Sequence, residues 1–92
     1  MSCIDTIRRL VREGRSEITI PHFLEEMLND DLEFADVEAA VARGCVRRQF
    51  TDDPRGTRYE IVGPARDGRQ VAVIVRVKAT GVLLLITTYL VE

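Results

Sequence analysis

Two hydrophobic patterns divide the chain near residue 44. Before this point, apolar residues recur every three or four positions, as in Ile4, Ile7, Leu10 and Val11. This is the spacing of one face of an α-helix. After it, apolar and polar residues alternate, most cleanly from Gln70 to Val77, which is the period of a half-buried β-strand. The pattern therefore predicts helices first and strands afterwards.

Two to three helices are expected in the first half. The first ends near Gly14, a residue common just after helices. The second begins at Pro21, whose missing N–H is not needed in a first turn, and its buried stripe starts at Phe23. A third helix is expected from about Glu33 to Arg43. Between the first two, the alternating segment Glu17–Ile20 predicts a short extended stretch.

Four strands are expected in the second half. The turn-forming pairs Asp67-Gly68 and Thr80-Gly81 separate the last three. Because such short connections leave no room for a crossover, these strands should be antiparallel neighbours. The fold class predicted for residues 1–92 is a single α+β domain, with the helices packed on a roughly four-stranded antiparallel meander. The expected strands are Cys45–Phe50, Arg58–Val62, Gln70–Val77 and Val82–Leu90.

Composition is that of an ordinary globular domain. The 92 residues are 46% hydrophobic and 30% charged. The longest apolar run, Val82–Ile86, is far too short to span a bilayer, and the first residues lack the apolar core of a signal peptide. We therefore expect a cytoplasmic protein with no membrane partner. In a reducing compartment Cys3 and Cys45 should be free, partly buried thiols.

The charges are segregated along the chain. The net charge is −2, yet no Lys or Arg occurs from Glu17 to Glu38, and positive residues dominate from Arg43 onward. Twelve of the thirteen basic residues are arginine. A GC-rich genome produces the same bias. Arginine is also the side chain best suited to phosphate, because its planar guanidinium donates two parallel hydrogen bonds.

The strand alternation predicts an arginine-bearing sheet face. If the valines of Val71–Val77 face the helices, Arg58 and Arg76 share the opposite face. Tyr89 shares a face with Thr87, but the pattern does not say which. Arginines beside an aromatic ring bind RNA by holding phosphates and stacking on bases. Arg58 and Arg76 are thus candidate phosphate ligands. The alternative is a solvated face of Arg–Glu pairs or a dimer surface.

His22 is the candidate proton-transfer group. It is the only histidine, it lies in the first turn of the second predicted helix, and Glu25 and Glu26 follow within one turn. Histidine is the commonest general acid or base near neutral pH. The alternative is a purely structural, hydrogen-bonded histidine. One histidine and two distant cysteines do not make a zinc site, so we expect neither a metal nor another cofactor.

Several short motifs follow one another in a specific order and spacing: His22, Glu25, Met27, Leu32, Asp36, Val37, Ala40, Gly44, Arg58, Tyr59, Ile61, Gly63, Asp67, Gly68, Arg69, Ile86, Thr87 and Tyr89. Their order resembles the small bacterial family called domain of unknown function 4258, over about residues 17 to 90. This resemblance implies the fold shared by RelE-type toxins and barnase-like nucleases, with RNA binding or cleavage that needs no metal. Glu26 stands where members commonly carry arginine.

Two functions are therefore expected as alternatives. The first is an uncharacterised small bacterial toxin-like domain that binds or cleaves single-stranded RNA, with an antitoxin-like protein as its partner. In that case Arg58 and Arg76 hold phosphate, while His22 and Tyr89 transfer protons, because cleavage needs one group to accept a proton and another to donate one. The second is a non-catalytic protein-interaction module, such as a homodimer that pairs an acidic helical surface with an arginine-bearing one.

Overall fold

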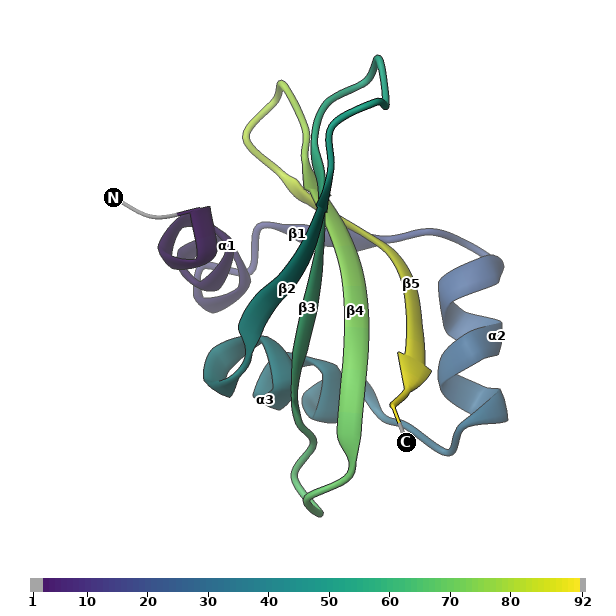
Figure 1. Cartoon of the computed structure of the whole chain (residues 1–92). Coiled ribbons are helices and arrows are strands. Elements are labelled where there is room, and N and C mark those ends of the chain that lie inside the picture. The colour runs from purple at the N-terminus through teal and green to yellow at the C-terminus, as the bar shows by residue number, and fades with distance from the viewer. Residues whose placement is uncertain (1–2, 92) are drawn as a thin grey trace.

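The computed structural model describes the backbone of residues 3–91 and the side chains of residues 4–91. Its three helices and five strands confirm the α+β class, with helices first and most strands afterwards (Figure 1). No helix of this described part is both long and apolar enough to cross a membrane. The elements are α1 (Cys3–Arg12), β1 (Ser16–Ile18), α2 (His22–Asn29), α3 (Phe34–Arg43), β2 (Cys45–Phe50), β3 (Arg58–Pro64), β4 (Gln70–Val77) and β5 (Leu83–Leu90).

The sheet is five-stranded and mixed, so the predicted four-stranded antiparallel meander is wrong in part. The strand order is β1-β5-β4-β3-β2. The three pairings among β2, β3, β4 and β5 are antiparallel, as expected for the turns at Asp67-Gly68 and Thr80-Gly81. However, β1 adds to the sheet parallel to β5, with Ser16 opposite Leu83. A three-residue strand whose partner lies more than sixty positions away leaves no local signal of that pairing.

One core lies between the helices and the sheet. α3 packs across β3 and β4, α2 packs against β5, and α1 contacts both α3 and β5. The inward positions of β4 are Val71, Val73 and Val75, all fully buried, as the alternation predicts. The other buried members of this core are Ile7, Leu10, Phe23, Met27, Leu32, Val37, Ala40, Val41, Ile61, Ala65, Leu83 and Leu85.

β1 and α2 together cover the outer edge of β5. Beyond β1, the Thr19 N–H donates to the Leu85 carbonyl at 3.1 Å. Further along, Glu26 of α2 accepts hydrogen bonds from the Thr87 hydroxyl at 2.5 Å and from the Thr88 N–H at 3.2 Å. Because β5 has neighbours on both sides, its nearly continuous apolar sequence is that of an internal strand. Pro21 precedes α2 as its N-cap residue rather than lying in its first turn.

Two glycines allow α3 and β3 to approach closely. A Cβ on Gly63 would overlap the Ala40 carbonyl oxygen and lie 2.7 Å from the Gly44 Cα. A Cβ on Gly44 would overlap the carbonyl oxygens of Ala40 and Val62. Glycine is therefore required at both positions for space. This contact fixes where β2 leaves α3 and how β3 lies beneath it.

Candidate functional site: the arginine face of the sheet

The face of the sheet opposite the core is crossed by three rows of directly paired residues. We call it the arginine face. Its side chains come from the positions that alternate with the buried valines, so the predicted sharing of this face by Arg58 and Arg76 is confirmed. The rows are Cys45–Val62–Ala72–Tyr89, Arg48–Glu60–Ile74–Thr87 and Phe50–Arg58–Arg76–Leu84.

A bulge in β2 brings two successive arginines to one carboxylate. The pairing register shifts between Val46 and Arg48, which leaves Arg47 as the extra residue. In a regular strand Arg47 and Arg48 would point to opposite faces. Instead, Arg47 Nε donates to Glu60 Oε1 at 2.6 Å, and Arg48 Nε lies 4.0 Å from Glu60 Oε2. The Glu60 side chain is only 2% exposed, so these guanidiniums compensate a buried negative charge.

A second bulge decides where Tyr89 lies. Ile74 pairs with Thr87 and Val75 with Leu85, so Ile86 is the extra residue of β5. Without this shift, Leu83, Leu85, Thr87 and Tyr89 would all face the core. With it, Tyr89 lies on the arginine face opposite Ala72. Its hydroxyl oxygen lies 3.5 Å from Arg47 Nη2. Partial burial and a hydrogen bond with Glu60 raise the pKa of Tyr89, so its phenol is neutral at pH 7.

The loop between β2 and β3 places a second buried carboxylate on this face. Asp53 accepts hydrogen bonds from the backbone N–H and the guanidinium of Arg55, and these hydrogen bonds lower the pKa of Asp53. Its Oδ2 also lies 3.5 Å from Arg58 Nε and 3.5 Å from Arg76 Nη1. Asp53 thereby lies between two arginines that the register sets side by side, and it offsets their repulsion.

The exposed part of this cluster is positive. Asp53 is 5% and Glu60 2% exposed, whereas the Arg48 and Arg55 side chains are 63% and 74% exposed. Arg58 is 33% exposed and Arg76 only 11%. Arg58 also lies over the Phe50 ring, 5.0 Å from its centroid. Among the described residues Arg58 Nε is buried without a hydrogen-bond partner. Arg48 Nε and Arg76 Nη1 lie 4.0 Å and 3.5 Å from their carboxylates, beyond normal hydrogen-bond length, so these donors are not consumed by the fold.

The contacts of His22 are with α2 and not with the arginine cluster. It begins α2, is exposed, and its Nε2 lies 3.1 Å from Glu26 Oε1. That same oxygen accepts the hydrogen bonds from Thr87 and Thr88. Among residues 4–91 no hydrogen bond or ion pair joins His22 to Arg58, Arg76 or Tyr89. The structure thus brings the two arginines together and places Tyr89 on their face, while His22 is held at the β5 edge.

Sequence reasoning missed much of this site. Its candidates do not include Asp53 and Glu60, the two buried carboxylates, or Arg47 and Arg48 of β2. The Asp-Pro-Arg-Gly segment indicates a turn but not that Asp53 folds back beneath two arginines. No sequence signal marks the β2 bulge that unites Arg47 with Arg48.

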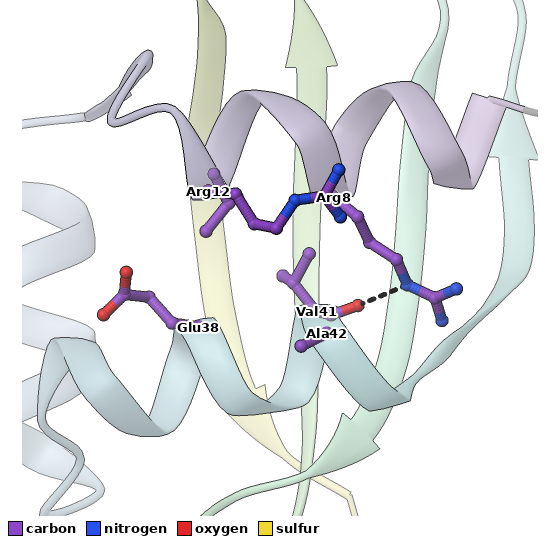
Figure 2. Close-up of a pocket in the computed structure, with 6 residues that line it drawn as sticks. Arg8, Arg12, Glu38, Val41 and Ala42 are labelled. Atoms are coloured by element: carbon purple, nitrogen blue, oxygen red, sulfur yellow. Dashed lines mark hydrogen bonds between the residues drawn. The ribbon is translucent and has the colours of Figure 1, made fainter.

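Other features of the described residues are less suited to a ligand. A cavity of about 80 Å³ lies between α1 and α3, lined by Val11, Arg12 and Val41 among others (Figure 2). Arg8 lines one side of it and donates from Nε to the Val41 carbonyl at 3.1 Å. Cavities for small organic ligands are several-fold larger. Across residues 4–91 no three His, Cys, Asp or Glu side chains are grouped to hold a metal ion.

The cysteines were expected to be free and partly buried. Cys45 is a free thiol, but it is exposed, because it begins the edge strand β2 on the arginine face. The side chain of Cys3 lies outside the described residues, so the prediction for it stays open to test.

Comparison with known proteins adds one finding. The sequence profile of the family described as Domain of unknown function (DUF4258) matches residues 20–90. The match starts after β1 and includes α2, α3 and the four antiparallel strands, and therefore the whole arginine face. Neither a curated protein nor a solved structure matches the chain.

Proposed function

Because this chain belongs to the DUF4258 family, whose description assigns no activity, we propose a function from its own geometry: it is a toxin-like module that binds single-stranded RNA on the arginine face. One observation carries the proposal. The two carboxylates of this face are buried, while the arginines around them are more exposed and keep unused donors. An approaching polyanion therefore meets guanidinium groups, although the whole chain carries a net charge of −2.

The proposed roles follow from exposure and position. Arg48, Arg55 and Arg58 hold phosphates, since each exposes a third or more of its side chain. Arg76 is nearly buried, so its role is to hold Asp53 below the surface. Tyr89 offers a neutral phenol beside Arg47, which suits stacking on a base or donation to a phosphate oxygen. A sheet face that carries arginines beside an aromatic side chain suits an unpaired strand, because the bases of a single strand are free to stack.

The test is the salt dependence of RNA affinity. Fluorescence anisotropy with a labelled single-stranded RNA of about 12 nucleotides should give a steep loss of affinity as salt rises, because bound counterions are released from the RNA. Arg48→Ala and Arg58→Ala should each weaken binding several-fold and lower the salt slope by roughly 0.7, the expected value for one phosphate contact on a single strand.

Arg12→Ala is the matched control. Arg12 is exposed on α1, on the helical side of the sheet (Figure 2), so its removal lowers the net charge equally without touching the arginine face. Equal effects of Arg12→Ala and Arg48→Ala would show that binding follows net charge and not this site. No binding at low salt would refute the RNA function and favour the alternative, a non-catalytic protein-interaction module.

A further inference from the structure

An apolar stripe is exposed on and beside α2. Ile20, Leu24 and Leu28 are 76%, 41% and 71% exposed. Leu24 and Leu28 are one helical turn apart, so they project from the same side of the helix. Glu26, which anchors α2 to β5, lies midway between them in sequence. At about 100° per residue it projects from the opposite side, so the stripe is the part of α2 that the fold leaves uncovered.

This apolar stripe is bordered by uncompensated negative charge. Glu25 precedes Leu28 by one turn, and Asp30 and Asp31 follow where α2 ends. Among residues 4–91 none of these three carboxylates pairs with a basic side chain. The nearest arginine in this corner, Arg69, instead donates to the backbone carbonyls of Asp30 and Asp31 and pairs with Asp67.

We propose that this surface docks a basic amphipathic helix of another protein. Exposed leucines at i and i+4 spacing fit the apolar face of such a helix, and the unpaired carboxylates of Glu25, Asp30 and Asp31 fit Lys or Arg on its flanks. A second copy of this chain fits poorly, because a two-fold α2–α2 contact would bring these unpaired carboxylates against one another. The proposal does not depend on RNA binding, since the stripe and the arginine face share no residue.

The interface is small. α2 has eight residues and is therefore about 12 Å long, which matches roughly two turns of a partner helix. We therefore expect weak binding, on the order of micromolar, with strong dependence on each leucine. A basic partner would also make the affinity fall with salt.

The experiment uses a synthetic peptide as the probe. A labelled helix of about 16 residues, with leucines on one face and lysines on both flanks, is titrated with the protein and followed by anisotropy. Leu28→Ala should weaken binding about tenfold or more, since burial of a leucine side chain carries that much affinity. Glu25→Lys should weaken it to a similar extent. Both residues are exposed, and circular dichroism checks that each variant folds.

Two controls separate docking from general attraction. Asp52→Lys makes the same charge change at an exposed carboxylate of the β2–β3 loop that lacks an ion pair among the described residues, and it should leave the affinity within about twofold. A peptide of the same composition, with its leucines spread around the helix, should bind at least about tenfold more weakly. Equal binding of the two peptides, or equal losses for Glu25→Lys and Asp52→Lys, would overturn the proposal. So would sedimentation showing a dimer that Leu28→Ala dissociates.

Discussion

The Asp36 carboxylate anchors the start of α3 to the turn between β3 and β4. It is buried and accepts hydrogen bonds from the Glu33 N–H at 2.9 Å and from Arg66 Nε at 2.9 Å. Arg66 also donates to it from its backbone N–H at 3.3 Å. The hydrogen bonds from Arg66 and then Glu33 lower the pKa of Asp36 to about 2. A single side chain thus joins a helix N-terminus to a hairpin thirty residues later.

Asp36 should make stability depend on pH in acid. Its pKa is about 2 in the folded protein, against an ordinary value of 3.8 for an aspartate side chain. Its stabilisation is therefore present in full above about pH 4 and is lost as the pH falls towards 2. Because Arg66 is half exposed, we expect a contribution of about 1–2 kcal/mol, less than the shift alone would give. Urea unfolding at pH 7, 4 and 2 measures this loss.

The Asp36→Asn variant isolates the carboxylate from the other acids. Its unfolding free energy should be lower at pH 7 and should fall less between pH 4 and pH 2. Glu33→Gln is the matched control, because Glu33 contacts the same arginine from an exposed position and should change stability by about 0.5 kcal/mol or less. An Asp36→Asn variant with an unchanged acid slope would contradict this role.

At the scale of elements, the junction of α3 with β3 depends on the absence of two side chains. Gly63→Ala should destabilise the protein by about 3 kcal/mol or more, since the new methyl group meets backbone that cannot yield as a flexible side chain would. Thermal unfolding should show a lower midpoint.

Gly14→Ala is the comparison for this prediction. Gly14 has a φ of 71° and open space around its Cβ position, so only the left-handed backbone opposes the substitution, at about 1–2 kcal/mol. Gly63 itself has no left-handed φ, so a loss for Gly63→Ala no larger than that for Gly14→Ala would mean that the contact between α3 and β3 can relax and does not require glycine.

The edge of β5 illustrates how one element completes another. β1 pairs with the first half of β5 and Glu26 of α2 bonds to Thr87 and Thr88 in the second half. An arginine at position 26 could not accept these two hydrogen bonds, because a guanidinium has no acceptor. In this chain Glu26 is therefore bound to the sheet edge through one carboxylate oxygen, Oε1.

At the scale of the whole molecule, the acidic segment and the arginine-rich segment of the chain lie on different surfaces. The acidic segment forms α2 and its flanks, and the arginines of β2, β3 and β4 collect on the far face of the sheet. RNA cleavage by His22 and Tyr89 would require a substrate that reaches from the arginine face to the β5 edge, because the two residues share no contact within the described part of the chain.

Because Tyr89 and His22 lie at different places, we expect their substitution to affect the rate of RNA cleavage differently. If the protein cleaves a labelled single-stranded RNA, Tyr89→Phe should slow cleavage by about 10²-fold or more, the typical contribution of one acid or base. His22→Ala should reduce the rate by a similar factor only if the substrate spans both places. Unchanged cleavage by His22→Ala, with RNA affinity intact, would remove His22 from the mechanism and leave it a structural partner of Glu26.

The sequence alone determined the three helices, the last four strands and the placement of two arginines on one face of the sheet. Period-3.6 and period-2 patterns locate the helices and the last four strands because they reflect which side of each element is buried. The same alternation places Arg58 and Arg76 on one face of the sheet, and the structure shows that they are directly paired there. The order of motifs also identifies the family, which the match over residues 20–90 confirms.

Only the tertiary structure decided the rest, for two physical reasons. Bulges at Arg47 and Ile86 change which face the following residues occupy, and an extra residue in a ladder depends on the partner strand rather than on local sequence. This is why Tyr89 could not be assigned to a face and why Arg47 was missed. Contacts across long sequence distances, such as β1 with β5 and Asp53 with Arg76, follow from how the whole chain packs. No periodicity within one segment records them.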